Sequence, residues 1–275
     1  MSIAITGASG KLGKLILKYL RQQATNEPLI ACVRKPEGAT DFEELGVEVR
    51  YCDYDVPGSL TPAFTGVDKL LLISGSDIDD TVRLRQHTQV VEAAKRAGVK
   101  HLSYTGFAFP GTVQVPPVPL HLATEQAIIT SGIPYTFFRN ALYADLTSQF
   151  GLDSAIRTGE LATFPGDWRF NTVTREDLAK AISSVLGSRP APHHVNRIYE
   201  LTAPRFWTFQ NLAEALSEIS GKNVVHREDP QNQSWIYGYL SKLNTTSTTE
   251  DLETLIGGPA TSLKESILPL IEWKK

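Results

Sequence analysis

Short apolar runs, rich in β-branched and aromatic side chains, recur along the first half of the chain. They lie at residues 3–6, 29–33, 47–51, 70–73, 101–105 and 135–139. Each run is apolar almost throughout instead of alternating with polar positions, which is typical of strands buried on both faces of a sheet. The pattern therefore predicts strands of a sheet that is covered on both sides.

Helical patterns separate these runs. The segment after the first run places its apolar side chains on one helix face, at Leu12, Leu15, Ile16, Tyr19 and Leu20. A later segment repeats this spacing and ends at a glycine, with Leu84, His87, Val91, Ala94 and Gly98. Such periodicity predicts amphipathic helices. Strands and helices that alternate in this way form right-handed βαβ units. We therefore expect an α/β fold with a Rossmann-like, doubly wound parallel sheet.

The pattern changes after residue 139, where glycine, proline and aromatic residues interrupt it. Residues 174–177 read as a capping box before a helix, and further short helices are expected at 209–220, 251–256 and 263–271. One more strand is expected at 197–201. We predict an NAD(P)-binding Rossmann domain over residues 1–150 and a smaller, mostly helical, substrate-covering lobe over residues 151–275. The two are interleaved if the late strand rejoins the main sheet.

Composition narrows the class of protein. The 275 residues suffice for a hydrophobic core without disulfides or metals. With 27 basic and 30 acidic residues the net charge is −3, which argues against nucleic acid as a partner. No apolar run approaches the roughly 18 residues of a membrane span, so we expect no membrane insertion, and the N-terminus does not resemble a signal peptide.

The two cysteines, Cys32 and Cys52, form neither a disulfide framework nor a metal motif. They are expected to lie on neighbouring strands and to stay reduced, which indicates a cytoplasmic location. The adjacent His193 and His194 have no acidic or cysteine partner nearby in the sequence. We therefore expect no metal site.

The strongest motif follows the first strand and opens the first helix. Its spacing is Gly-x-x-Gly-x-x-Gly, with Gly7, Ser9, Gly10, Lys11, Leu12 and Gly13 as the expected phosphate-binding residues. Glycines permit a tight turn, close approach of the backbone to a diphosphate, and close packing of helix on strand. Free N–H groups at a helix N-terminus bind phosphate. The motif predicts a dinucleotide site.

Residues at the ends of the next strands suggest which dinucleotide is bound. Arg34 stands 21 residues after Gly13, where an acidic residue selects NAD and an arginine favours the 2′-phosphate of NADP. Lys35 would add a second charge, although both could be solvated side chains at a strand end. We therefore expect NADP(H) as the cofactor.

Asp53 is placed to accept a hydrogen bond from the adenine amine, or simply to cap a turn near Ser59. Ser74, Gly75 and Ser76 are small enough to let a cofactor ribose pass over the sheet edge, or they form a plain turn. We include all four among the expected cofactor-binding residues.

Several segments resemble one known group of proteins. They lie at residues 3–13, 32–36, 68–74, 93–100, 135–140 and 255–266. Together they are similar to the NmrA-like atypical short-chain dehydrogenase/reductase family, and the last segment is closest to the type-2 NADPH:quinone oxidoreductases of bacteria. The resemblance spans nearly the whole chain and implies an NADPH-dependent quinone oxidoreductase. A non-catalytic NADP(H)-sensing regulator of the same family is the alternative.

One departure from the wider superfamily concerns catalysis. Residues 120–126 contain no Tyr-x-x-x-Lys, the pair that protonates or deprotonates the substrate oxygen. His121 stands near a position where related reductases carry a catalytic lysine. It is a weak candidate for an acid that titrates near neutral pH, or it is a loop histidine. A quinone accepts hydride readily and takes protons from water, so we expect no essential protein acid or base.

A flat quinone favours aromatic walls. Phe107, Phe109 and Tyr143 follow the fifth and sixth strands at the edge where such folds bind ligands, although each could equally be a core residue. Asn140 is expected to hydrogen-bond the nicotinamide amide or a quinone oxygen. The physiological acceptor and the oligomeric state are left open by the sequence.

Overall fold

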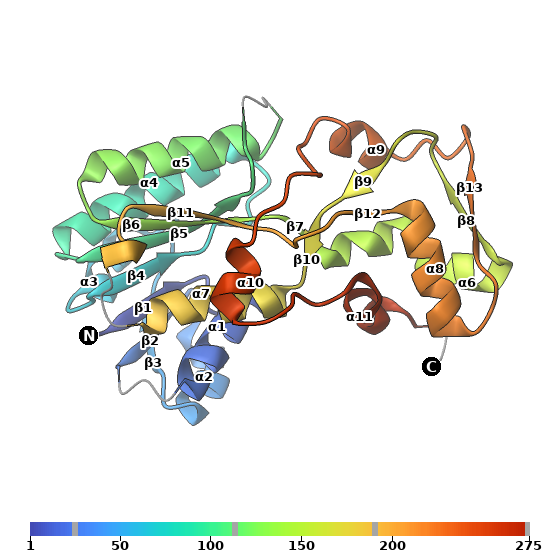
Figure 1. The fold of residues 1–275 in the computed structure, drawn as a ribbon. Coiled ribbons are helices and arrows are strands. Elements are labelled where there is room, and N and C mark those ends of the chain that lie inside the picture. The colour runs from blue at the N-terminus through green and yellow to red at the C-terminus, as the bar shows by residue number, and fades with distance from the viewer. Residues whose placement is uncertain (24–26, 112–114, 189–191, 273–275) are drawn as a thin grey trace.

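A seven-stranded parallel sheet forms the centre of the molecule (Figure 1). The computed structural model describes residues 1–23, 27–111, 115–188 and 192–272. The strands are β1 (Ile3–Thr6), β2 (Leu29–Val33), β3 (Glu48–Tyr51), β4 (Lys69–Leu72), β5 (His101–Phe107), β6 (Tyr135–Asn140) and β11 (Arg197–Leu201). Their order is β11-β6-β5-β4-β1-β2-β3, with every neighbour parallel. The predicted Rossmann-like fold is confirmed, and its order reverses between β1 and β4.

Helices cover both faces of this sheet (Figure 1). On one face lie α1 (Lys11–Gln22) and α7 (Arg175–Gly187), with α10 (Asp251–Ile256) packed against α7. On the other lie α3 (Leu60–Phe64), α4 (Asp80–Arg96) and α5 (Val118–Ser131). A 3₁₀ turn at Pro36–Gly38 and the short α2 (Thr40–Glu44) join β2 to β3, and a second 3₁₀ turn at Pro57–Ser59 lies between β3 and α3. Two separate apolar clusters therefore fill the space above and below the sheet.

The C-terminal lobe lies beyond the carboxyl ends of the strands (Figure 1). Its helices are α6 (Leu152–Thr158), α8 (Phe209–Ser220), α9 (Trp235–Leu240) and α11 (Leu263–Ile267), with 3₁₀ turns at Ala144–Phe150, Pro192–His194 and Leu268–Leu270. It is less helical than predicted, because three two-stranded sheets accompany them. These pair β7 (Leu142–Tyr143) with β10 (Thr172–Val173), β9 (Arg169–Phe170) with β12 (Trp207–Thr208), and β8 (Glu160–Thr163) with β13 (Val225–Glu228). Four of these six strands are only two residues long, so the hydrophobic pattern of the sequence does not reveal them.

Part of the chain after residue 150 returns to the main sheet. β11 extends the sheet beside β6, and α7 packs on α1. At the start of α7, the Thr174 hydroxyl accepts from the Asp177 N–H, which is the N-cap half of the predicted capping box. The Asp177 carboxylate accepts from Thr261 N–H, so it ties down the C-terminal segment. The domain boundary at residue 150 stays a prediction.

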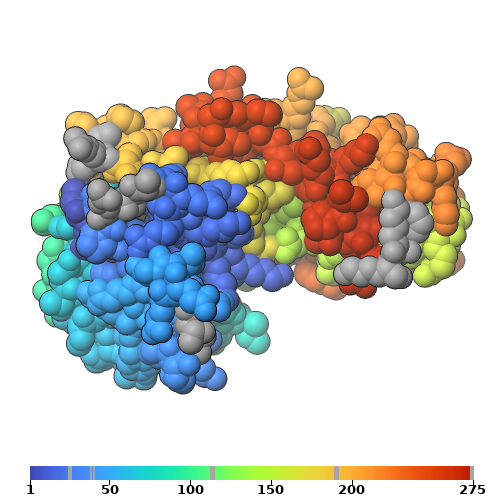
Figure 2. Space-filling model, turned by 90° about the horizontal axis from the view of Figure 1, so that it is seen from below, coloured from blue at the N-terminus to red at the C-terminus, as the bar shows by residue number. Residues whose placement is uncertain are grey.

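The surface is hollowed where these parts meet. Figure 2 shows a concavity between the N-terminal part of the sheet layer, in blue and cyan, and the C-terminal lobe, in red and green. Among the described residues, no helix is both long and apolar enough to cross a membrane.

Candidate functional site

The carboxyl ends of β1 to β4 surround a cavity of about 390 Å³. It lies where the strand order reverses, which is where doubly wound sheets bind ligands. Many of the predicted cofactor residues line it, namely Gly7, Ser9, Gly10, Arg34, Asp53, Ser74, Gly75 and Ser76. Lys11, Leu12, Gly13, Lys35 and Asn140 are described by the structure but do not line this cavity. The structure therefore brings together four loops that the sequence only predicted to meet.

The glycine loop has the geometry of a phosphate cradle. Gly7 has φ +61°, which favours glycine, and its carbonyl accepts from Gly10 N–H at 3.0 Å. A Cβ on Gly13 would lie 2.5 Å from the Gly7 oxygen and 2.8 Å from Ala8 Cα. Helix α1 therefore packs against the loop only with glycine at position 13. The N-cap residue of α1, Gly10, has no side chain to satisfy the first N–H groups of the helix, so these can bind an anion.

Arg34 and Asp53 border the same cavity from β2 and β3. Arg34 is exposed at the end of β2, where it can reach a bound phosphate. The backbone of Asp53 exchanges hydrogen bonds with the Ser59 hydroxyl, and its carboxylate accepts from Asp55 N–H at 3.0 Å. Asp53 therefore stabilises a local turn while it lines the cavity.

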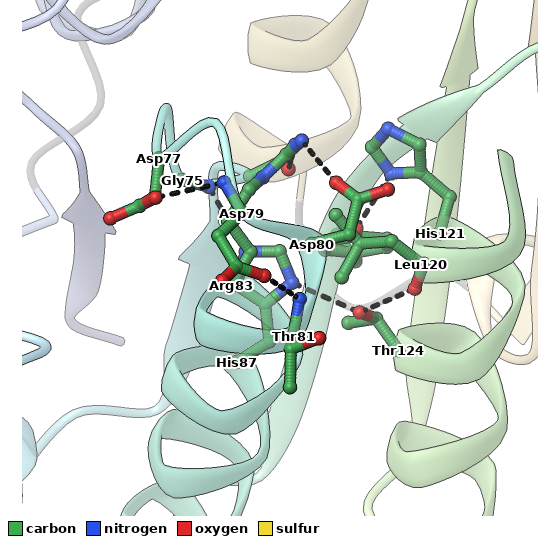
Figure 3. A network of polar contacts seen from close by, with 12 residues as sticks. Gly75, Asp77, Asp79, Asp80, Thr81, Arg83, His87, Leu120, His121 and Thr124 are labelled. Atoms are coloured by element: carbon green, nitrogen blue, oxygen red, sulfur yellow. Dashed lines mark hydrogen bonds and ion pairs between the residues drawn. The ribbon is translucent and has the colours of Figure 1, made fainter. Parts of the chain in front are cut away.

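The loop after β4 is held by a buried histidine (Figure 3). Gly75 N–H donates to His87 Nε2 at 3.0 Å, so the ring proton is on Nδ1. That nitrogen lies 2.9 Å from the Thr124 hydroxyl, which in turn donates to the Leu120 carbonyl. Burial lowers the pKa of His87 to about 3. His87 is therefore a neutral core histidine, which agrees with its place on the apolar face of the predicted helix, and it links the cavity to helix α5.

Arg83 supports the same loop from α4. Its guanidinium donates to the Ser74 hydroxyl at 2.8 Å. It also pairs with Asp80 at 3.1 Å (Figure 3). Its Nε is buried without a hydrogen-bond partner among the described residues. The guanidinium thus places a fixed positive charge beside the cavity-lining Ser74.

His121 is buried beside Tyr104 instead of lying in a loop. It belongs to the first turn of α5, is 7% exposed, and its Nδ1 lies 2.7 Å from the Tyr104 hydroxyl. Burial, with the nearby charge of the Arg83 guanidinium, lowers the pKa of His121 to about 3. Burial also raises the pKa of Tyr104. Near neutral pH the pair carries no charge, so the expectation that His121 titrates there was wrong.

A buried glutamate, Glu125, lies one helical turn after His121 in α5. Glu125 is 5% exposed and binds Arg139 through two hydrogen bonds of 2.9 and 2.7 Å. Arg139 also binds Glu200 at 2.9 Å, and Glu200 accepts from Phe109 N–H at 2.8 Å. Phe109 has φ +47°, a strained value for a residue with a side chain. This chain of charges holds the loop after β5.

The four predicted acceptor residues differ in their surroundings. Phe107 and Phe109 line a crevice of about 10 Å³, which is too small for an aromatic ring. Asn140 is 4% exposed, and its Oδ1 has no hydrogen-bond partner among the described residues. Burial raises the pKa of Tyr143, while a hydrogen bond with the Asn140 side chain opposes that shift. The structure thus pairs Asn140 with Tyr143 through their side chains and with Phe107 in the strand register of β5 and β6.

Comparison with known proteins fits this geometry. The model of the NmrA-like family matches residues 1–246. The chain belongs to the NmrA-like family. It is 36% identical to quinone oxidoreductase 2 of Escherichia coli over 225 residues, which cover 82% of this chain and 77% of that protein.

Two solved structures are similar over almost the whole chain. The triphenylmethane reductase of Citrobacter sp., complexed with NADP(H), is 42% identical, covers 98% of this chain and 100% of its own, and has a TM-score of 0.88. The NADPH complex of an E. coli NADPH-dependent quinone oxidoreductase is 32% identical, covers 98% and 99%, and has a TM-score of 0.84. The NmrA-like fold thus extends through the C-terminal lobe.

In this NmrA-like protein, the sequence did not indicate that Arg175 and Asp145 lie near Tyr143. Arg175 lies over the Tyr143 ring, 4.2 Å from its centroid, and pairs with Asp145. Lys11 Nζ of the glycine loop lies 3.8 Å from the same carboxylate. The sequence indicated only that Arg175 starts a helix, because nothing local to residues 11, 145 and 175 shows that they meet.

Among the described residues, no cluster of three His, Cys, Asp or Glu side chains is arranged to hold a metal.

Proposed function

We propose that this NmrA-like protein is an NADPH-dependent reductase that transfers a hydride from NADPH to a quinone without a Tyr-x-x-x-Lys pair. The observation that carries the proposal is the single cavity at the sheet's reversal point, where the glycine loop, Arg34 and the Ser74 loop meet. Relatives crystallised with NADP(H) support the choice of cofactor.

The residues present fit this cofactor. The free N–H groups of α1 would bind the diphosphate, and Arg34 would bind the 2′-phosphate through two hydrogen bonds. The unpartnered Oδ1 of Asn140 would accept from the nicotinamide carboxamide, which removes a costly orphaned acceptor. When bound, NADPH supplies the hydride, and these side chains fix its orientation towards the acceptor.

The proposed acceptor chemistry needs no protein acid. A quinone gains aromaticity on reduction and takes its protons from water, so positioning is the protein's main contribution. The lowered pKa of His121 agrees with this, because near neutral pH its imidazole is neutral and carries no imidazolium proton to donate. A cationic triarylmethane dye needs only hydride at its central carbon, and the 42% identical triphenylmethane reductase makes such dyes the second acceptor to test.

One observation favours the alternative of a non-catalytic NADP(H) sensor. The crevice between Phe107 and Phe109 holds about 10 Å³, so a quinone would need these rings to move. A sensor needs the dinucleotide cavity and no acceptor space.

The test is NADPH oxidation by the purified protein with a soluble benzoquinone, and separately with a cationic triarylmethane dye. We expect turnover with the quinone. His121→Ala should lower kcat by less than the roughly 10²–10⁴-fold loss typical of a missing general acid, and Tyr143→Ala should lower it more. NADPH binding without turnover on either acceptor would favour the sensor.

A further inference from the structure

The chain's two cysteines border the dinucleotide cavity side by side. Cys32 is in β2, and Cys52 directly follows β3, its parallel neighbour. The N–H of Cys52 donates to the Val33 carbonyl at 2.9 Å, which continues the pairing of the two strands past Tyr51. Both cysteines line the cavity together with Arg34 and Asp53. The thiols therefore occupy adjacent positions on one wall.

Each thiol by itself is expected to react slowly with reagents that attack a single sulfur. Cys32 is 1% and Cys52 4% exposed. Hydrogen bonding to Cys52 and burial raise the pKa of Cys32 well above its usual value. Since the thiolate is the nucleophile, a one-point alkylating agent or a peroxide would attack slowly.

The placement of the thiols also disfavours a direct disulfide. In the strand register Cys32 stands opposite Arg50, so Cys52 is diagonal to it. A disulfide demands a narrow range of Cα separations and Cβ directions. A larger atom that bonds to both sulfurs tolerates a wider spacing, and it gains affinity because its second bond forms within the same complex.

We propose that Cys32 and Cys52 form a two-thiol site for bidentate thiophilic ligands, with trivalent organoarsenicals as the ligand class. The arsenic–oxygen double bond of R–As=O is replaced by two arsenic–sulfur bonds. The two thiol protons leave with the oxygen as water, and neither arsenic nor sulfur changes oxidation state. No oxidant or reductant is required.

The position of the site sets its consequence. An arsenical bound to both thiols would occupy the cavity that Arg34 and Asp53 also line, which is the part assigned to the adenosine end of the cofactor. It should therefore exclude NADPH, and bound NADPH should protect the thiols. This competition rests on the proposed cofactor site, whereas formation of the adduct does not.

The experiment uses phenylarsine oxide on the full chain, read by intact mass after gel filtration. Thiol counting on the untreated, denatured protein should find the two cysteines of the sequence free. Wild type should retain one phenylarsenic group per chain. Cys32→Ala and Cys52→Ala, checked for folding by circular dichroism, should hold the reagent roughly 10²- to 10⁴-fold more weakly. A wild type without adduct, or single-cysteine variants that bind equally well, would overturn the proposal.

Two further measurements, reversal by a dithiol and protection by NADPH, need only the wild-type protein. The dithiol 2,3-dimercaptopropanol should strip the arsenical and restore NADPH binding measured by fluorescence, while an equal thiol concentration of 2-mercaptoethanol should not. Saturating NADPH should slow adduct formation. Unchanged kinetics with NADPH demonstrably bound would contradict the location. Failure to bind NADPH would count against the proposed function alone, since the adduct is read by mass.

Discussion

At the residue scale, preference for NADP(H) depends on Arg34. Arg34 lines the cavity directly after the end of β2 and is exposed there, so its guanidinium can reach a bound phosphate. A charge-assisted, two-point contact with a phosphate is worth more than a neutral hydrogen bond. Arg34 is therefore the residue whose loss should separate NADPH from NADH.

Arg34→Ala should weaken NADPH binding by about 1.5–3 kcal/mol, roughly ten- to a hundredfold, because a hydrogen-bonded charge pair is lost. NADH affinity should change little, since it lacks the 2′-phosphate. Fluorescence titration of both cofactors measures this, with Arg96→Ala, an exposed arginine at the far end of α4, as the control. Equal affinity of wild type for both cofactors would contradict the assignment.

Two glycines of the loop should fail in different ways. Gly10→Val should abolish NADPH binding and leave the fold intact, because the only close neighbour of a Cβ there is the Gly7 oxygen at 3.2 Å, and the rest of the side chain enters the phosphate space. Gly13→Val should destabilise the protein, since its Cβ would meet backbone at 2.5 Å. Circular dichroism melts and NADPH titration distinguish the two. A Gly10→Val protein that still binds NADPH would remove the cradle from the site.

At the element scale, α4 and α5 are joined to the cavity by buried neutral histidines. His87 connects Gly75 to Thr124, and His121 contacts Tyr104 on β5. The hydrophobic pattern placed His87 on the apolar face of its helix, whereas His121 followed a run of prolines that suggested a loop. Packing of α5 against the sheet decided the burial of His121, and no local pattern reports that.

These histidines should make the protein sensitive to acid. Burial lowers the pKa of His87 and His121 from 6.5 to about 3, so the unfolded chain takes up these protons first. The stability is complete above about pH 6.5 and is lost as pH falls towards 3. Between pH 7 and pH 5 each histidine should remove about 2 kcal/mol from the free energy of unfolding.

Denaturant unfolding at several pH values measures this loss. His121→Gln should flatten the pH dependence, whereas His193→Ala should not, because His193 is exposed. An unfolding free energy that is constant across this pH range would show that neither histidine is held neutral by the fold.

At the scale of the whole molecule, the sheet layer is completed by late parts of the chain. β11 covers the edge of β6, and α7 buries Leu178 and Ile182 in the cluster that also contains Ile16 of α1. A chain ended at residue 150 would expose that strand edge and that apolar face. The first 150 residues are therefore not expected to form a stable unit alone.

Ending the chain at residue 150 should abolish cooperative unfolding and NADPH binding. Thermal melts followed by circular dichroism, together with cofactor titration, measure both properties against the full chain. A cooperative melt with NADPH binding in residues 1–150 would show that the Rossmann part folds without β11 and α7.

Local patterns were enough to predict the sheet, the main helices and the glycine loop. Apolar runs report burial, and Gly7, Gly10 and Gly13 report backbone geometry within a few residues of themselves. Arg34 was found by its distance from Gly13, because the length of a βα unit nearly sets which residue ends the second strand. These features depend on neighbours in the chain, so the sequence alone determined them.

Only the tertiary structure decided which side chains meet across the site. Arg83 reaches Ser74, Arg175 lies over Tyr143, and Glu200 clamps the backbone of Phe109. These contacts join segments that are brought together by the strand order and by the C-terminal lobe. No local pattern in the sequence indicates that the two residues of such a contact meet. The protonation state of His121 follows the same rule, because desolvation depends on everything packed around the ring and not on its neighbours in the chain.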